Sequence, residues 1–267
     1  MIGVGLVVVL AVLRAFENRF IFLPPRYPDG FPAPGNYPAD LEEVWISTED
    51  GICLNAWFRA NPASTKVLLW LHGNATNIGR QMDELQAYSR LGVNILALDY
   101  RGYGKSEGSP DEAGVYRDGE AAYRYLIGKR GFSPENIIVY GHSLGGAVAV
   151  DLASRHSCGG LIVESSFTSM GEMARMMFHL PLTEYLPRSR FDSLAKIARV
   201  HAPILIIHGT RDSTVPFSMG QRLFDAAPEP KWFLPVEGGE HNSIYLEGGE
   251  KYWRALERFV KGVQPKA

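Results

Sequence analysis

The chain has 267 residues, of which 46% are hydrophobic and 21% are charged, and this composition is typical of a single globular domain. It excludes a disordered, collagen-like or coiled-coil protein. The 27 lysines and arginines nearly balance 29 aspartates and glutamates, so the formal net charge is −2 and no nucleic-acid partner is expected. The two cysteines, Cys53 and Cys158, provide neither a disulfide framework nor a zinc site.

The first thirteen residues are apolar and uncharged. As a helix they would reach about 20 Å, which is too short to cross the roughly 30 Å hydrocarbon core of a bilayer. Because aromatic residues then alternate with charged ones, we predict that residues 1–23 form a membrane-anchoring segment at the interface; a helix packed in the domain core is the alternative. No basic leader or A-x-A-like site indicates a cleaved signal peptide. The positions of Arg14, Arg19 and Arg26 favour a cytoplasmic catalytic domain.

Residues 24–40 are rich in proline and glycine, which disfavours both a helix and a central strand and predicts an extended linker. We expect one domain over residues 41–262 and a β-hairpin at its start. Apolar residues alternate with polar ones on both sides of Asp50-Gly51, which is typical of two antiparallel strands joined by a turn.

After the hairpin, short apolar runs alternate with stretches in which apolar residues recur every three or four positions. The short runs fit buried strands, and the longer stretches fit helices. This alternation predicts an α/β fold with a mostly parallel sheet covered on both faces. The expected strands are 67–71, 93–98, 137–140, 161–163, 204–207 and 232–236, and the expected helices are 81–91, 113–128, 144–155, 218–226 and 250–260.

A glycine-rich turn with a serine at its centre follows the strand expected at 137–140. The sequence GHSLG at 141–145 has the form G-x-S-x-G, in which a sharp turn between strand and helix exposes the serine. Glycines on both sides remove the Cβ atoms that would clash in so tight a turn. Ser143 is therefore a candidate nucleophile rather than an ordinary turn residue.

A serine nucleophile needs a base, and the base needs a carboxylate that orients it. Asp212 lies in the loop after the strand expected at 204–207, and His241 lies in a glycine-containing loop after the last strand. Both loops can reach the edge of the sheet at which Ser143 lies. Glu164, directly after another strand, is the alternative acid.

Three other histidines, His72, His142 and His208, also lie at strand ends or turns. Each is an alternative to the proposed base, although we expect His72 and His208 to brace loops and His142 to point away from the serine beside it. No histidines are spaced as metal ligands, so no metal centre is expected.

Acyl transfer also requires hydrogen-bond donors for the negative charge that develops on the substrate oxygen. Two backbone amides are candidates: that of Leu144, directly after the serine, and that of Asn74, in the loop after the strand expected at 67–71. A plain β-turn with an asparagine cap is the alternative for the second loop.

Together these motifs resemble those of the α/β-hydrolase superfamily, and within it the N-terminally membrane-anchored serine hydrolases with a small cap. The resemblance spans nearly the whole chain. It implies an eight-stranded α/β-hydrolase fold, a triad of Ser143, Asp212 and His241, and hydrolysis of carboxylic esters or thioesters through an acyl-enzyme without a cofactor. The motifs are LHGNATN at 71–77, LDYRGYGKSEG at 98–108, GHSLGG at 141–146, ESSFTS at 164–169, HGTRDSTVP at 208–216 and GGEHN at 238–242.

The stretch 165–190 is too long for a simple connection, and an insertion at this point of the fold covers the nucleophile. We expect a small cap there. Adaptable apolar side chains gather in it, and they suit acyl chains of variable length; packing of the cap onto the sheet is the alternative. The candidate substrate-binding residues are Met170, Met173, Met176, Met177 and Phe178.

The sequence therefore predicts a serine hydrolase that acts on hydrophobic, lipid-like esters at a membrane surface. A thioesterase acting on acylated protein or coenzyme A needs the same residues and stays open as an alternative. A serine peptidase is disfavoured because no large specificity domain accompanies the core, and a silent membrane-associated binding protein is disfavoured by the complete triad. The natural substrate and the oligomeric state stay open.

Overall fold

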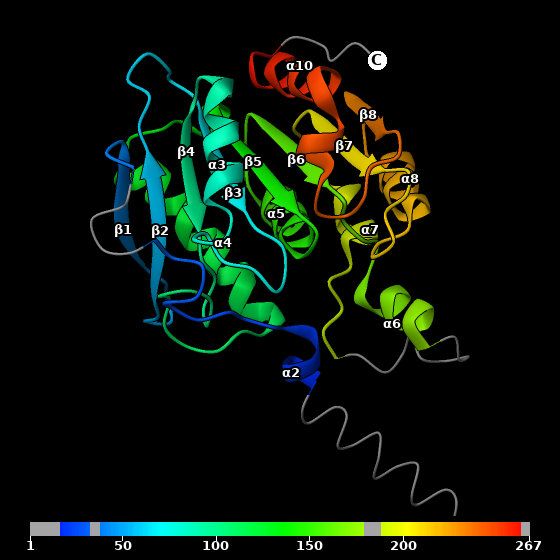
Figure 1. Cartoon of the computed structure of the whole chain (residues 1–267), viewed down its shortest axis with the longest axis horizontal. Helices are drawn as coiled ribbons and strands as arrows, with labels where there is room; N and C mark the ends of the chain where they lie inside the picture. The colour runs from blue at the N-terminus through cyan, green and yellow to red at the C-terminus, as the bar shows by residue number, and fades with distance from the viewer. Residues whose placement is uncertain (1–16, 33–37, 179–187, 263–267) are drawn as a thin grey trace, which may run out of the picture.

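One mixed sheet forms the centre of the molecule. The computed structural model describes residues 17–32, 38–178 and 188–262. Its strands are β1 (Leu41–Ser47), β2 (Cys53–Arg59), β3 (Val67–Leu71), β4 (Asn94–Leu98), β5 (Ile137–His142), β6 (Gly160–Glu164), β7 (Ile204–Gly209) and β8 (Lys231–Val236). They form a single eight-stranded sheet in the order β1-β2-β4-β3-β5-β6-β7-β8 (Figure 1).

Only the β1–β2 and β2–β4 pairs are antiparallel, and the other five pairs are parallel. This confirms the predicted mostly parallel sheet of an α/β-hydrolase fold. The helices of the described residues are α2 (Glu17–Ile21), α3 (Met82–Tyr88), α4 (Glu112–Gly128), α5 (Leu144–Arg155), α6 (Met170–Phe178), α7 (Ser193–Ile197), α8 (Phe217–Ala226), α9 (Ile244–Glu247) and α10 (Gly249–Val260), with short 3-10 turns at Ser89–Leu91 and Pro134–Asn136.

Two hydrophobic cores lie on opposite faces of the sheet. Side chains alternate along each strand, so Leu69 and Val139 join the core under α4, α5 and α8, whereas Trp70 and Tyr140 join the core under α3 and α10. Every residue of β3 to β7 is buried. This two-sided burial is the reason that these strands read as continuous apolar runs.

Several strands are longer than their apolar runs predicted. The strand expected at 137–140 continues to His142, and the strand expected at 161–163 continues to Glu164, with which His142 pairs. The hydrogen bonds of a sheet join backbone groups and do not depend on the side chain. Polar residues can therefore extend a strand although they do not appear in its apolar pattern. The helix expected at 81–91 ends at Tyr88 and continues as a 3-10 turn, which Gly92 closes at φ 68°.

The described part of the predicted linker lies against the domain. Arg26 forms a β-bridge with Gly104, and the ring of Phe31 packs edge to face on Trp57 at 5.5 Å. This contact helps to bury Trp57 on the face of β2 that the pattern predicts to be polar. None of the helices described is both long and apolar enough to cross a membrane. The apolar residues 1–13 of the predicted anchor lie outside the described residues.

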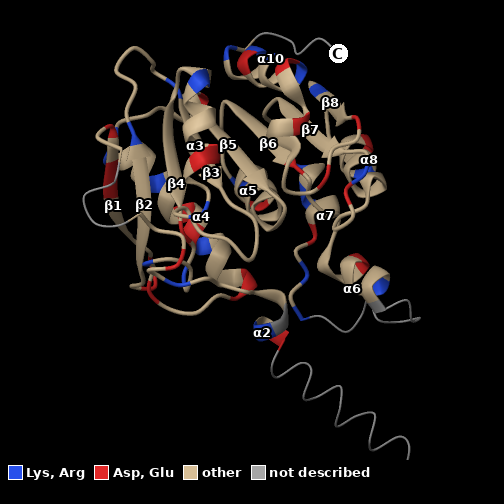
Figure 2. Ribbon diagram, in the orientation of Figure 1, with Lys and Arg blue, Asp and Glu red and all other residues tan. Residues whose placement is uncertain are grey.

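Charged side chains of both signs are interspersed over the helices and loops in view (Figure 2). Among the charged residues that are buried, Glu84 and Glu164 lie close together on the α3 side of the sheet. Burial raises the pKa of Glu84 to about 8, and the nearby charge of Glu164 adds to this rise. Burial also raises the pKa of Glu164 to about 7, although the hydroxyl of Tyr252 donates a 2.8 Å hydrogen bond to it.

The substitution Glu84→Gln is expected to stabilise the protein at alkaline pH. A carboxyl whose pKa is raised by folding favours the native state below its unfolded pKa and loses this contribution as pH rises towards 8. At pH 9 the variant should therefore gain on the order of 4 kcal/mol in free energy of unfolding, and at pH 5 less than about 1 kcal/mol. Urea denaturation at the two pH values measures this difference. The exposed Glu237→Gln is the control, and an equal effect of Glu84→Gln at both pH values would contradict the assignment.

Candidate active site

Ser143 lies in a strained turn between β5 and α5. Its backbone has φ 53° and ψ −116°, a region that residues with a side chain rarely adopt. Three hydrogen bonds hold this conformation: the Ser143 N–H donates to Glu164 O at 2.9 Å, and its carbonyl accepts from Gly146 N at 3.0 Å and from Ser166 Oγ at 2.8 Å. The side chain is only half-buried, so the turn presents its hydroxyl at the sheet edge.

Glycines around Ser143 allow backbones to approach closely. A Cβ atom at Gly141 would lie 2.1 Å from Gly145 O, and one at Gly145 would lie 2.1 Å from Leu71 O. At Gly146 it would lie 2.5 Å from the Ser166 Cβ. The glycines of the motif are therefore required by packing of the turn against its neighbouring strand and loop.

The structure brings Ser143, His241 and Asp212 together. Asp212 follows β7 and His241 follows β8, at the same end of the sheet as the turn after β5. His241 Nε2 lies 3.0 Å from Ser143 Oγ, and His241 Nδ1 lies 2.7 Å from Asp212 Oδ2. Both the imidazole and the carboxylate are buried. A serine, a base and an orienting carboxylate thus form one continuous chain of hydrogen bonds.

Asp212 is held in its charged form by several donors. Burial works to raise its pKa, but hydrogen bonds from His208 and His241, and the backbone amide of Val215, hold that pKa well below its usual range. The second oxygen, Oδ1, accepts from Thr214 N at 2.9 Å and Val215 N at 2.7 Å. The carboxylate therefore stays ionised and fixed in orientation at neutral pH.

His208, one of the alternative bases, lies behind Asp212 and does not face the serine. Its Nε2 is 2.9 Å from Val215 O and 3.4 Å from Asp212 Oδ2. Its Nδ1 faces Gly220, where an added Cβ would lie 2.4 Å away, so a neutral ring carries its proton on Nε2. His208 thus braces the acid loop, as the sequence predicted for it.

His142 is fully buried and holds the backbone of the candidate base. Its Nε2 lies 2.9 Å from His241 O. Burial, with a smaller contribution from the neighbouring His241, lowers its pKa to about 4, so His142 is neutral near pH 7 and donates this hydrogen bond. No pattern in the sequence indicates this contact, because the motif defines only the spacing of His142 from Ser143.

The remaining alternatives also have structural roles. His72 is buried, with Nδ1 2.7 Å from Gly73 O and Nε2 3.3 Å from Asp99 Oδ1. The Glu164 side chain accepts from Tyr252 on the α10 side of the sheet and contacts neither His241 nor Asp212. Neither residue therefore replaces the base or the acid.

Two backbone amides near the serine turn are the candidates for the oxyanion donors. The N–H of Leu144 is in the first turn of α5, where an amide has no partner within its own helix. Gly73 brings the loop after β3 against the turn, because an added Cβ there would lie 3.3 Å from Ser143 Cβ. Asn74 is the next residue of that loop, so its amide comes directly after the glycine that approaches Ser143.

The cap helix α6 packs on the domain with most of its methionines. Met170, Met173 and Met176 are partly buried against the main core, whereas Met177 is 71% exposed. These contacts agree with packing of the cap onto the body for three of the five candidate residues. The side chain of Phe178 and residues 179–187 of the predicted cap lie outside the described residues.

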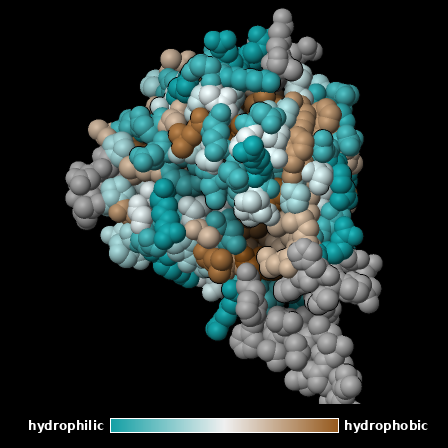
Figure 3. Space-filling view, turned by 45° about the vertical axis from the view of Figure 1, so that its right-hand side comes forward, coloured by the Kyte–Doolittle hydropathy of each residue, from teal (hydrophilic) through white to brown (hydrophobic). Residues whose placement is uncertain are grey.

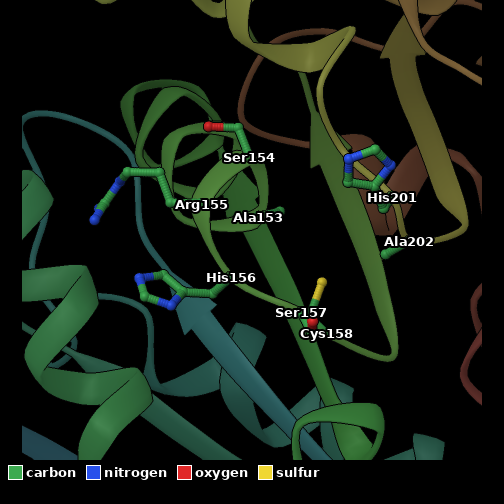
Figure 4. A pocket seen from close by; sticks show the side chains of 8 residues that line it. All are labelled: Ala153, Ser154, Arg155, His156, Ser157, Cys158, His201 and Ala202. Carbon is green, nitrogen blue, oxygen red and sulfur yellow. The ribbon is translucent and has the colours of Figure 1, made fainter.

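A cavity of about 180 Å³ lies at the C-terminal end of α5, the opposite end from Ser143 (Figure 4). It is lined by Arg155, His156, Cys158 and His201 among others and contains none of the three hydrogen-bonded residues. In the described part of the chain, no cluster of three or more His, Cys, Asp or Glu could hold a metal ion.

Comparisons with known proteins agree with this fold. A model described as the alpha/beta hydrolase family matches residues 68–195. The chain is 39% identical over 225 residues to alpha/beta hydrolase domain-containing protein 17C of Xenopus tropicalis, which covers 82% of this chain and 70% of the relative. It is 30% identical over 290 aligned positions to alpha/beta hydrolase domain-containing protein WAV2 of Arabidopsis thaliana, which covers 99% and 94%. The chain therefore belongs to the α/β-hydrolase family.

A solved structure, the Pyrococcus furiosus esterase Pf2001, has the same fold. It superposes with a TM-score of 0.74 at 21% identity, over 90% of this chain and 98% of the esterase.

The substitution Gly145→Ala tests the close packing around the nucleophile. Its methyl group would meet Leu71 O, a backbone atom that cannot rotate away. We expect a loss of about 3 kcal/mol in free energy of unfolding. Gly128→Ala is the matched control, since its methyl group meets nothing within 4 Å and should stabilise the end of α4 by about 0.5 kcal/mol. Equal stability of the two variants in denaturant titrations would show that the turn tolerates a side chain.

Proposed function

We propose that the protein is a serine hydrolase that cleaves carboxylic esters through an acyl-enzyme. The observation that carries this proposal is the continuous hydrogen-bonded chain from Ser143 Oγ through His241 to Asp212. The family of the chain supports hydrolysis, and its likeness in fold to a protein named an esterase supports esters as the substrate class.

In the proposed mechanism, His241 Nε2 takes the proton of Ser143 as its Oγ attacks the ester carbonyl. The ionised Asp212 stabilises the imidazolium that forms. The negative charge on the former carbonyl oxygen is bound by the amides of Leu144 and Asn74, a contribution of roughly 3 to 4 kcal/mol for one donor where it has been measured.

Collapse of this tetrahedral intermediate breaks the bond between the carbonyl carbon and the alcohol oxygen. The imidazolium of His241 gives its proton to that oxygen, and the alcohol leaves. Water then attacks the acyl-enzyme with the same base, and Ser143 recovers its proton as the acid departs.

We further propose that the substrate is hydrophobic and that the protein acts at a membrane surface. The apolar first thirteen residues precede α2. Two large hydrophobic side chains are exposed nearby in the chain or in the cap: Leu23, which follows α2, and Met177, which lies in the cap helix α6. Hydrophobic atoms also gather towards the lower edge of the face shown in Figure 3. Such a surface suits lipid-like esters and contact with a bilayer.

Hydrolysis of a p-nitrophenyl ester series, from acetate to palmitate, tests the proposed chemistry. We expect the intact protein to favour the longer acyl chains and Ser143→Ala to lose at least about 10³-fold in kcat. Ser154→Ala, at the far end of the same helix, is the control and should keep full activity. Turnover of acyl thioesters but of no ester would replace the ester proposal by the thioesterase alternative.

Flotation with phosphatidylcholine vesicles tests the membrane proposal. The full chain should float, and the double substitution Val8→Asp, Leu10→Asp should leave it at the bottom, because each buried charge costs roughly 2.5 to 3.5 kcal/mol in an apolar helix. Val8→Ile, Leu10→Ile is the control. If the charged variant still floats, residues 1–13 do not anchor the protein.

A further inference from the structure

The side chain of Asn74 is bonded on both sides to the segment that follows the apolar N-terminus. Its Nδ2 donates to Ile21 O at 2.5 Å, and its Oδ1 accepts from Leu23 N at 3.1 Å. The same oxygen also accepts from the hydroxyl of the buried Tyr103 at 2.7 Å. The residue proposed to supply the second oxyanion amide is thus fixed by residues 21–23.

Two more polar side chains of the same loop reach this segment. Asn77 Nδ2 donates to Asp29 O at 2.8 Å and to Pro25 O at 3.3 Å. Arg80 forms an ion pair with the carboxylate of Asp29. At Gly79 an added Cβ would lie 2.9 Å from the backbone of Gly30, so the two chains also touch directly. The loop that follows β3 therefore lies along the N-terminal segment from residue 74 to residue 80.

The same segment also holds the chain that returns from the cap. The buried carboxylate of Glu17 accepts from the backbone amides of Arg188 and Ser189, at 2.7 Å each. Glu112, in the first turn of α4, accepts from the next two amides, of Arg190 at 2.6 Å and of Phe191 at 2.7 Å. Arg190 O in turn accepts a hydrogen bond from the first amide of α6. The hydrogen bonds that hold residues 188–191 are therefore connected to the cap helix.

An aromatic contact completes the attachment. Phe22 is 2% exposed, and its ring packs edge to face against that of Phe191 at 6.0 Å. Phe191 also contacts the rings of Tyr116 and Phe167. The segment is therefore tied into the main core between its two polar attachments, to the Asn74 loop and to the cap return.

We propose that residues 17–31 are a positioning element, which fixes the oxyanion loop through Asn74 and the cap return through Glu17. This inference rests on the proposed ester hydrolysis. An oxyanion donor stabilises the transition state only if it is held in place beforehand, and small displacements of such groups reduce the rate of the chemical step. Loosening the segment should therefore lower kcat more than it changes KM. The segment also follows directly on the proposed anchor, so the part of the chain at the membrane is fastened to the oxyanion loop.

The variants Phe22→Ala and Glu17→Ala test this role, since neither residue belongs to the triad or supplies an oxyanion donor. We expect about a tenfold fall in kcat on the best p-nitrophenyl ester, with KM changed less than about twofold. The conservative variants Phe22→Leu and Glu17→Gln should recover most of the loss, because they keep an apolar side chain and a hydrogen-bond acceptor. All variants are assayed well below their measured Tm.

Hydrogen exchange gives a readout that is independent of turnover. The backbone amides of residues 73–80 should exchange fastest in Phe22→Ala, more slowly in Phe22→Leu and slowest in the unmodified protein. Those of β5 and α5 should keep their protection in both variants. Unchanged exchange of that loop, or an unchanged kcat in both alanine variants, would overturn the positioning role. If the unmodified protein hydrolyses no ester, the proposed function fails, and faster exchange of residues 73–80 would still support the attachment on its own.

Discussion

The left-handed turn at Ser143 is the constraint on which the rest of the structure depends. A side chain at φ 53° persists only because the surrounding chain fixes it, and here Glu164 O holds its amide while the motif's glycines let Leu71 O and the turn come within contact. Parallel strands end at one edge, so the loops after β3, β7 and β8 reach the same point as this turn. The local strain and the strand order thus jointly place a hydroxyl, an imidazole and a carboxylate within hydrogen-bond distance.

Buried carboxyls near this edge have opposite ionisation behaviour, and the difference lies in their donors. Asp212 is surrounded by two imidazoles and two backbone amides, which outweigh burial and keep it charged. Glu84 has one donor, from Gln81, and a like charge nearby, so burial prevails and its pKa rises to about 8. Burial alone therefore does not identify a charged residue that could orient a base. For Asp212 the donors outweigh burial, whereas for Glu164 burial outweighs its hydrogen bonds and raises its pKa to about 7.

The sequence predicted the sheet, most helices and the three hydrogen-bonded residues, because each has a local signal: apolar period, glycine spacing, or a loop after a strand. It did not predict that residues 24–32 would cover β2, since Phe31 meets Trp57 only in the folded chain. It also missed Glu17 and Glu112. Any residue type except proline can supply the backbone amide that such a carboxylate accepts from, so the donor side has no sequence signal. Glu17 also lies 171 positions from Arg188, which is too far for a spacing pattern to indicate the contact.

The polar contacts of residues 21–29 also explain how the loop after β3 can be held still enough to carry the proposed oxyanion donor. The loop after β3 contributes Ile78 to the core, but Asn74, Asn77 and Arg80 bind the N-terminal segment instead. Each such hydrogen bond contributes about 1 kcal/mol, which is small against the whole fold but comparable with the free energy of opening one loop. The N-terminal segment therefore orders this loop through its hydrogen bonds and adds to the main core through Phe22. In a hydrolase that acts at a membrane, the same contacts would keep the site assembled where the anchor meets the bilayer.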